Sequence, residues 1–473
     1  MKKIRIIIPT FFLSLIVIPF ILYFVDKHSN QQEIPQLDIK FLKLNNKIPV
    51  IFIPNKKVPA ILNMIWFNVG GVDEPKNKTG IAHFFEHIIF HNTINYDKGE
   101  YDAFLESIGG SNNAFTSFDY TSYFSIFPKE YFSKILDFEF DRLNNLIFDP
   151  DLIENEKKII LEERLLRKEN NPGQELMINT KKVLFGAQNP YSRPLIGYED
   201  DIKNITLDDL KEFKLNHYNS DKIFFVISGD ITEDELLKIL NEKFTQYFVE
   251  NQQKTPQNIN IQKQVFPEIK DQDKIIIKKS HKIDSYNVNW VYRINNFYEQ
   301  KEKNRYALIV LNKMLSDLPN SLLTQNFVID NQIAINAATS NASLSRLGGN
   351  YFAISFSLKE KEKLPLLYNN MKLLLQNLKL GRFNNELFET AKQNLISNSI
   401  YDKESFKSLG FNIGFAYASG LKQKDIVNWE KNIQAVKYRD IIQVANKIFI
   451  KENLVRSYLI PENDNDFINL IND

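Results

Sequence analysis

The same order of expected secondary-structure elements occurs twice along the chain, and this repeat limits the possible folds more than any other feature. Each copy opens with two short apolar runs rich in Ile, Val, Tyr and Phe, which predict strands, and continues with a helix, another strand and two longer helices. The first copy occupies 49–54, 61–69, 80–90, 120–127, 131–146 and 152–169. The second occupies 274–278, 287–294, 305–315, 350–358, 364–378 and 386–401. Strands in hairpin-like groups with paired helices predict an α+β fold rather than alternating βαβ units.

A polar stretch separates the two copies. Residues 250–273 are rich in Gln, Asn and Lys, contain two prolines and show no hydrophobic periodicity, which is typical of a linker. We therefore expect an N-terminal segment over 1–30, a first domain over 31–250, a linker over 251–273 and a second domain over 274–473.

The N-terminal segment predicts a membrane anchor. Residues 6–25 are twenty consecutive uncharged, mostly apolar positions, preceded by Lys2, Lys3 and Arg5. As a helix such a run spans roughly 30 Å, and the positive-inside rule sends the rest of the chain across the membrane. The alternative is a cleaved signal peptide, but 26–30 lacks a small-x-small cleavage site. We expect a single-pass protein of a bacterial inner membrane with its bulk on the periplasmic side.

Composition excludes several classes of function. The 473 residues include no cysteine, which excludes a disulfide scaffold, thiol catalysis and a cysteine-ligated zinc or iron–sulfur site. A net charge of +1 gives no reason to expect a nucleic-acid partner. Hydrophobic residues make up 43% and charged residues 25%, which excludes a disordered chain and a multi-span membrane protein.

Three of the six histidines fall within nine residues. His83 and His87 are four apart, so on a helix they share one face, with Glu86 close to it. This His-x-x-Glu-His arrangement can bind one Zn²⁺ through two imidazoles and offers a carboxylate as general base. His91 continues the spacing one turn further, where we expect a structural or supporting role. The motif alone leaves open a chance match with histidines satisfied in the core.

A catalytic zinc needs a third protein ligand. Glu156 and Glu163 are seven apart on an expected helix and therefore share a face, which Ile159 and Ile160 mark as the buried one. Buried carboxylates are costly unless paired or metal-bound. We therefore predict Glu163 as the third ligand of one Zn²⁺ per chain and Glu156 as a catalytic carboxylate that supports it. The alternative is a solvated charged helix.

With these residues in view, the sequence resembles the insulinase and mitochondrial-processing-peptidase family of zinc peptidases (M16), over about residues 37–449. The likeness extends beyond the five-residue motif, and the distal Glu163 follows His87 by 76 positions, a spacing similar to the family's. The matching segments are 70–75, 80–93, 109–121, 189–197, 217–218 and 229–230.

The resemblance implies a fold of two homologous αβ roll domains, each an antiparallel-rich sheet with helices packed on one face. It also implies a zinc-dependent endopeptidase that cleaves extended or unfolded peptides, with Glu86 taking a proton from water and passing it to the leaving amine. Asn113 and Ala114 match the edge strand on which the family lays its substrate. An extended peptide can add there as a further strand and bind through main-chain hydrogen bonds.

The second half departs from the family pattern. Fully equipped members carry an arginine and, seven residues later, a tyrosine that hold the substrate and stabilise the oxyanion. The matching positions here are Val328 and Ile335. We therefore expect a second M16-like subunit in a heterodimer that supplies this pair, or else a homodimer. Arg346 or Tyr351 of the same chain is an alternative source of the missing groups.

A function of another class competes with the peptidase. The family contains non-catalytic members that serve as assembly or scaffold subunits, in this case of an envelope complex, and the missing pair favours this alternative. The ligand set His83, His87 and Glu163 together with Glu86 favours the enzyme, because a complete ligand set plus a base has no structural use of its own. Metal storage is excluded on the same ground, since it needs no general base.

Overall fold

The computed structural model describes residues 38–45, 47–247, 266–271, 274–294 and 303–471. Residues 38–473 form one compact unit, within which we call 38–247 the N-terminal half and 266–471 the C-terminal half. The expected membrane anchor over 6–25 and most of the expected linker lie outside the described residues. Within the described ranges, no helix has the length and apolar character needed to cross a membrane.

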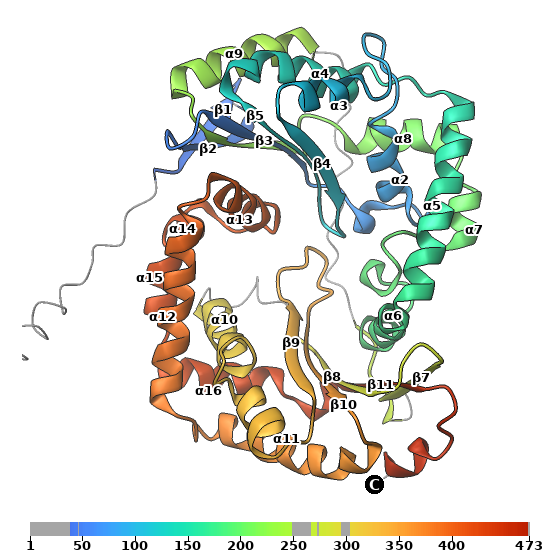
Figure 1. Cartoon of the computed structure of the whole chain (residues 1–473), viewed down its shortest axis with the longest axis vertical. Helices are drawn as coiled ribbons and strands as arrows, with labels where there is room; N and C mark the ends of the chain where they lie inside the picture. The colour runs from blue at the N-terminus through green and yellow to red at the C-terminus, as the bar shows by residue number, and fades with distance from the viewer. Residues whose placement is uncertain (1–37, 46, 248–265, 272–273, 295–302, 472–473) are drawn as a thin grey trace, which may run out of the picture. The chain divides into compact units, whose positions relative to one another are not determined.

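A six-stranded sheet forms the centre of the N-terminal half (Figure 1). Its strand order is β1-β2-β6-β3-β5-β4, and neighbours are antiparallel except for the parallel pair β2 and β6. The strands are β1 (Lys40–Leu44), β2 (Ile48–Pro54), β3 (Ala60–Phe67), β4 (Ser111–Thr116), β5 (Thr121–Pro128) and β6 (Ile223–Gly229). The last strand of this half, β6, is therefore inserted between the second and the third, and β4 lies at an edge.

The C-terminal half repeats this topology in a five-stranded sheet of order β7-β11-β8-β10-β9. The strands are β7 (Ile275–Ser280), β8 (Tyr286–Arg293), β9 (Asn336–Ala342), β10 (Tyr351–Leu358) and β11 (Leu454–Pro461). The last strand, β11, lies between β7 and β8 and is parallel to β7, as β6 in the first sheet lies between β2 and β3 and is parallel to β2. The expected two-domain α+β fold is confirmed, and each sheet is antiparallel apart from one parallel pair of strands.

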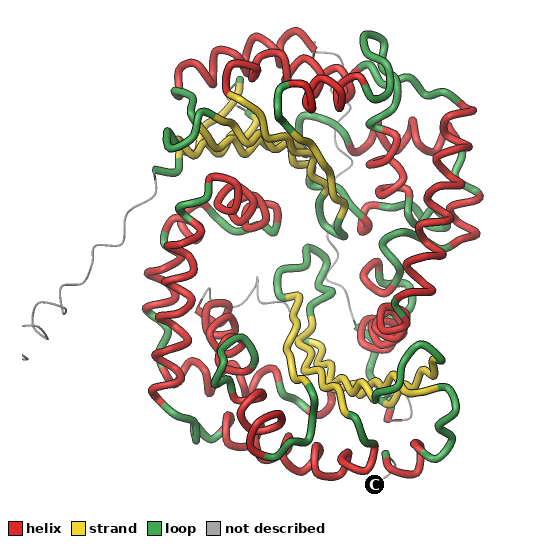
Figure 2. The backbone as a smooth tube through the Cα atoms, in the orientation of Figure 1, coloured by secondary structure: helices red, strands yellow, loops and turns green. Residues whose placement is uncertain are grey.

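Most helices of each half pack on one face of its own sheet (Figure 2). The helices of the N-terminal half are α2 (Ile81–Ile88), α3 (Glu100–Ser107), α4 (Phe132–Asn144), α5 (Pro150–Asn170), α6 (Pro172–Phe185), α7 (Glu199–Lys203), α8 (Leu207–His217) and α9 (Glu233–Tyr247). The helices of the C-terminal half are α10 (Lys303–Leu315), α11 (Leu364–Lys379), α12 (Asn385–Asp402), α13 (Phe406–Ala418), α14 (Gln423–Val427), α15 (Trp429–Gln434) and α16 (Tyr438–Ile448). Each half buries its own apolar core between sheet and helices.

The other face of each sheet contacts a helix from the opposite half, which the expectation of helices on one face did not include. Helix α13 packs on β3 and β6, and α6 packs on β7, β8 and β11. Two glycines of α13 allow the close approach, since a Cβ at Gly410 would lie 2.4 Å from a methyl carbon of Leu62 and one at Gly414 would lie 2.4 Å from the Trp66 ring. The halves are therefore joined by reciprocal helix packing.

Candidate metal centre

The short helix α2 is fixed firmly at its first residues. Gly80 precedes it with φ +89°, and a Cβ there would lie 2.4 Å from the carbonyl oxygen of Ile196, so this position requires glycine. The buried carboxylate of Glu74 accepts hydrogen bonds from the amides of Gly80, at 3.0 Å, and Ala82, at 3.3 Å. These contacts satisfy amide groups that a helix start leaves without intrahelical acceptors.

Helix α5 contacts α2 and brings two glutamates to its histidines. It begins with an Asp149 side chain that accepts hydrogen bonds from two amides of the first turn, and Pro150 occupies the first helical position. Ile160 is fully buried, but Ile159 is 50% exposed, so our expectation that both residues mark the buried face is wrong for Ile159. The 100° step between adjacent helical residues turns Ile159 outward.

His83, His87 and Glu163 come together as one group. Their potential ligand atoms all lie within 4.8 Å of one another. Oε2 of Glu163 lies 3.7 Å from Nε2 of His83 and 3.6 Å from Nε2 of His87, both too long for hydrogen bonds. Two ligands of a tetrahedral zinc, each about 2.0–2.1 Å from the ion, are themselves separated by about 3.3 Å.

The ligand atoms of His83, His87 and Glu163 are placed to bind a metal ion rather than to form hydrogen bonds with one another. Oε2 of Glu163 is buried and accepts no hydrogen bond from the described residues, although Oε1 pairs with Arg167. A buried carboxylate oxygen without a donor is costly unless a cation satisfies it. The residues present therefore suit a Zn²⁺ ion with two imidazole ligands and one carboxylate ligand.

The two histidines of the group differ in their electrostatic environment, which lowers the pKa of His83 and raises the pKa of His87. Burial, together with the charges of His87 and Arg167, lowers the pKa of His83 to about 3, so this ring is neutral at pH 7, as a metal ligand must be. Burial acts to lower the pKa of His87, but its hydrogen bond to Glu156 and the nearby carboxylates outweigh this effect, and the pKa is raised. A positive charge is therefore stabilised at this position.

The carboxylate of Glu156 contacts the rings of both His87 and His91. Its Oε1 lies 2.9 Å from Nδ1 of His87, its Oε2 lies 2.9 Å from Nε2 of His91, and Lys98 Nζ is 3.5 Å away. The hydrogen bonds to the two rings hold the pKa of Glu156 well below its usual range. Glu156 is not a member of the metal group and supports His87. We expected a structural or supporting role for His91, and the structure places its ring against Glu156; Lys98 was not singled out from the sequence.

Glu86 points from α2 toward the edge strand β4. The Thr116 hydroxyl donates a 2.5 Å hydrogen bond to its Oε2. Burial raises the pKa of Glu86, and the Thr116 hydrogen bond and the charge of His87 partly offset this effect. A carboxylate with a raised pKa is closer to the value that proton transfer at neutral pH requires. Sequence reasoning did not assign Thr116 a role, although it lies within the segment 109–121.

Asn113 and Ala114 lie on β4, whose partner β5 pairs only one of its two edges among the described strands. Asn113 is exposed, and its side chain accepts a hydrogen bond from the amide of Ala114. The strand contacts α2 directly. The structure therefore places both predicted substrate residues on a strand that contacts the helix of the metal group and has one edge unpaired by any described strand.

None of the residues of the C-terminal half that we considered for the missing arginine and tyrosine belongs to the metal group. Val328 packs against the core of that half, and Ile335 is 60% exposed at the start of β9. Arg346 pairs with Asp73, and the Tyr351 ring lies 5.2 Å from Nζ of Lys181. Both alternative sources of the missing arginine and tyrosine are therefore engaged in other contacts.

Comparison with known proteins agrees with this geometry. Residues 50–197 match the insulinase family (peptidase family M16), and residues 204–395 match the domain described as the peptidase M16 inactive domain. The chain is 26% identical to the zinc protease PqqE of Helicobacter pylori over 427 residues, which cover 88% of this chain and 92% of that protein. It is 30% identical to the mitochondrial-processing peptidase subunit beta of Dictyostelium discoideum over 183 residues, 38% of each chain.

Solved structures show the same fold. A protease from Helicobacter pylori superposes with a TM-score of 0.79 at 24% identity, over 90% of this chain and all of that one. A putative M16-like peptidase from Alicyclobacillus acidocaldarius superposes with a TM-score of 0.75 at 17% identity, over 91% of this chain and 99% of that one.

Proposed function

Because the chain belongs to the insulinase (M16) family of peptidases, we propose that it is a zinc-dependent endopeptidase that cleaves extended or unfolded peptides. The observation that carries this proposal is the convergence of His83, His87 and Glu163, with Glu86 beside them on the same helix. Two imidazoles, a carboxylate ligand and a separate carboxylate base form the set that hydrolysis of a peptide bond by a zinc enzyme requires.

In this proposal His83, His87 and Glu163 would hold one zinc ion. A bound Zn²⁺ supplies Lewis acidity, which polarises the scissile carbonyl and makes a water molecule more acidic. Glu156 keeps the proton of His87 on Nδ1, so that the lone pair of Nε2 is available on the side of Glu163.

Glu86 is the general base of the reaction. It accepts a proton from the attacking water and returns it to the leaving amine, which requires a carboxylate that is both within reach and not too acidic. Two observations support this role. The raised pKa of Glu86 is closer to the value that proton transfer at neutral pH requires, and the hydrogen bond from Thr116 fixes the position of the carboxylate.

The substrate adds to the free edge of β4 as a further strand. Main-chain groups around Asn113 and Ala114 pair with the backbone of an extended peptide, so that affinity depends little on its side chains. The position of β4 against α2 supports this, because a strand added there passes the metal group.

We further propose that a second M16-like chain completes the site. Val328 and Ile335 stand where the family has an arginine and a tyrosine, and loss of an oxyanion donor lowers the rate by about 10²–10³. A heterodimer supplies both groups, whereas a homodimer would have to form the oxyanion site differently. The apolar character of these two positions also favours the competing function, a non-catalytic assembly subunit.

Cleavage of an unstructured reporter peptide by the purified full chain tests the proposal. The zinc-loaded protein is compared with Glu86→Gln and with Glu162→Gln, an exposed carboxylate on α5 outside the metal group. We expect chelator-sensitive cleavage that Glu86→Gln abolishes and Glu162→Gln retains, with zinc bound by all three proteins. Efficient cleavage by the chain alone supports the peptidase and contradicts the need for a partner chain. Zinc binding without cleavage favours the missing partner or the assembly subunit, and failure to bind zinc contradicts the proposal.

The membrane anchor over residues 6–25 is a separate proposal about location. It rests on the sequence pattern described above. Carbonate extraction of membranes from cells expressing the full chain tests it, since an anchored chain stays with the membrane and a peripheral or cleaved one is released.

A further inference from the structure

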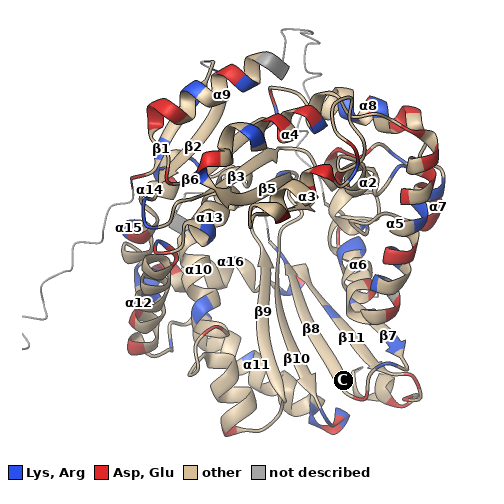
Figure 3. Cartoon of the chain, turned by 45° about the horizontal axis from the view of Figure 1, so that its top comes forward, with Lys and Arg blue, Asp and Glu red and all other residues tan. Residues whose placement is uncertain are grey.

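One charged residue stands at the tip of an otherwise uncharged hairpin. The hairpin of β9 and β10 spans 336–358, and its two strands carry no charged residue (Figure 3). Arg346, in the loop that connects them, is the only charged residue of this segment. An arginine in the connecting loop of a hairpin is free to remain in solvent, so its engagement with another part of the chain requires a reason.

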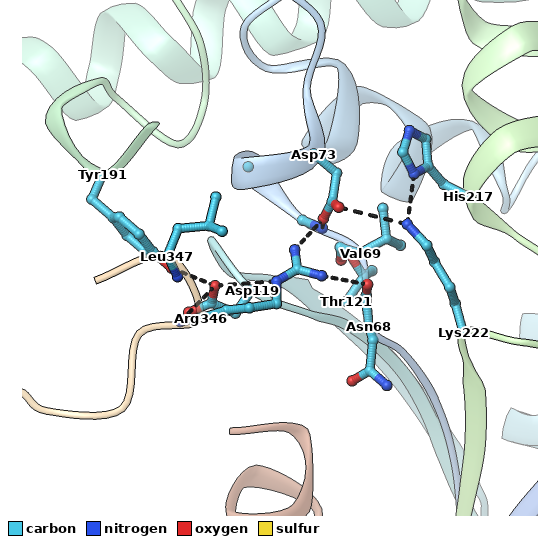
Figure 4. A network of polar contacts seen from close by, with 12 residues as sticks. Asn68, Val69, Asp73, Asp119, Thr121, Tyr191, His217, Lys222, Arg346 and Leu347 are labelled. Carbon is cyan, nitrogen blue, oxygen red and sulfur yellow. Dashed lines mark hydrogen bonds and ion pairs between the residues drawn. The ribbon is translucent and has the colours of Figure 1, made fainter. Parts of the chain in front are cut away.

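The Arg346 side chain reaches from the C-terminal half into the N-terminal half (Figure 4). Its Nη2 lies 2.5 Å from Oδ2 of Asp73, and its Nη1 donates to the carbonyl oxygen of Asn68 at 3.1 Å. The next amide, of Leu347, donates to the hydroxyl of Tyr191 at 3.1 Å, and this hydroxyl donates to Oδ1 of Asp119 at 2.5 Å. Three separate segments of the N-terminal half thus hold the hairpin tip.

The buried carboxylate of Asp73 has the Arg346 guanidinium as its nearest positively charged partner. Its carboxylate is only 2% exposed and accepts a hydrogen bond from the amide of Gly70 at 3.0 Å. The other cation near it, Lys222, lies 3.6 Å from Oδ1 and also hydrogen-bonds His217 at 3.0 Å. Removal of Arg346 leaves a buried carboxylate with only a more distant, shared partner, which is unfavourable.

Asp73 is directly linked to the metal-binding helix. Its neighbour Glu74 holds the amides of Gly80 and Ala82, at the first turn of α2. Movement of the turn at Asp73 therefore moves the acceptor that fixes the start of the helix carrying His83 and Glu86.

The same turn is also linked to the substrate strand. The amides of Gly71 and Val72 donate to the carbonyl oxygens of Ser117, at 3.1 Å, and Phe118, at 2.9 Å. Ser117 follows Thr116, the last residue of β4 and the donor to Glu86. The turn held by Arg346 thus contacts both elements that form the proposed active site.

We propose that Arg346 is a positioning residue for this site: through Asp73 it fixes α2 and β4 relative to each other. The half of the chain that carries no zinc ligand thereby contributes to the metal centre of its own chain. The effect on catalysis rests on the function proposed above, whereas the effect on α2 and β4 does not.

Hydrogen–deuterium exchange of the metal-free full chain tests the positioning directly. We compare the native chain with Arg346→Met and with Lys278→Met. The control removes a cation of similar reach from another ion pair between the halves, in which Lys278 Nζ lies 2.9 Å from Oε2 of Glu175 on α6. We expect amides of 81–88 and 111–116 to exchange about tenfold faster in Arg346→Met and unchanged in Lys278→Met.

Zinc affinity and kinetics then separate positioning from general destabilisation. In Arg346→Met we expect about tenfold weaker zinc binding by chelator competition and a kcat about 10- to 100-fold lower with little change in KM. Arg346→Lys keeps the charge but loses the second hydrogen bond, so intermediate values are expected.

Three outcomes are decisive. Exchange that stays unchanged in α2 and β4 overturns the proposal, and so does exchange that rises uniformly over the whole chain. If the native chain cleaves nothing by itself but Arg346→Met loosens α2 and β4 and weakens zinc binding, the chain alone is not a peptidase while the positioning role stands.

Discussion

Nδ1 of His87 lies 2.9 Å from Oε1 of Glu156. A carboxylate with a lowered pKa is an acceptor only, so this contact keeps the proton of the ring on Nδ1 and leaves the lone pair on Nε2. Glu156 thus acts on the metal group through His87 without entering it, which gives this residue a different role from that of Glu163.

Replacement of this acceptor is expected to weaken zinc binding without removing it. Glu156→Gln keeps the shape of the side chain but can accept through only one of its terminal atoms, so the orientation of His87 or His91 is lost. We expect the zinc dissociation constant to rise about 10- to 100-fold, measured by competition with a chromogenic chelator. Glu162→Gln is the matched control on the same helix, and equal affinity in both variants contradicts the supporting role.

The hydroxyl of Thr116 is expected to matter for turnover. Thr116→Val is nearly isosteric but removes the hydrogen bond to Glu86. We expect kcat/KM to fall about 10- to 100-fold, because a hydrogen bond to a charged group contributes about 1.5–3 kcal/mol. Thr116→Ser restores the donor and should recover most of the activity. Loss in Thr116→Ser equal to that in Thr116→Val would indicate that packing of the methyl group, and not the hydrogen bond, is responsible.

The packing of α13 on the first sheet is expected to tolerate no added methyl group. In Gly414→Ala the new Cβ lies 2.4 Å from the Trp66 ring, so strand or helix has to shift. We expect the free energy of unfolding to fall by about 1–3 kcal/mol, measured by urea denaturation. The control is Gly173→Ala near the start of α6, where the nearest atom is 3.4 Å away and alanine favours the helix. Similar stability of Gly414→Ala and the native chain would contradict the close contact.

His217 is expected to make stability depend on pH. Burial, then the charge of Lys222, lowers its pKa to about 4, below the usual value of 6.5 in the unfolded chain. Between pH 4 and 6.5 the unfolded state therefore binds more protons, and stability falls as the pH falls through this range. The limiting slope for one proton is about 1.4 kcal/mol per pH unit.

Urea denaturation of the native chain and of His217→Gln at pH 5 and pH 7 measures this dependence. The glutamine variant removes the titration and should show a smaller difference between the two pH values. Identical differences in both proteins would assign the pH dependence to other groups.

Local spacing was enough to predict the part of the site that lies on one helix. The positions of His83, Glu86 and His87 follow from the helical period, and the structure has all three on α2. Glu163 is 76 positions after His87, and no period connects two different helices, so its prediction rested on the need for a third ligand and on its shared face with Glu156; the resemblance to a family added a matching spacing. The Ile159 error shows the limit of adjacent apolar residues as a marker of a buried face.

Contacts between distant segments could not be predicted. The insertion of β6 beside β2 and of β11 beside β7 depends on packing, not on local pattern. The pair of Arg346 and Asp73 joins residues 273 positions apart. The only signal in the sequence was a single charge in an uncharged hairpin, which marks a residue of interest but does not identify its partner.

The position of α13 in the chain has a consequence for synthesis. The face of the first sheet that α13 covers is formed by β3 and β6 and is complete in sequence at Gly229, but α13 itself spans Phe406–Ala418. A ribosome adds about 5–20 residues per second. This apolar surface therefore stays uncovered for many seconds before α13 has been synthesised. A nascent N-terminal half is thus the stage at which the chain is most exposed to aggregation and most in need of a chaperone.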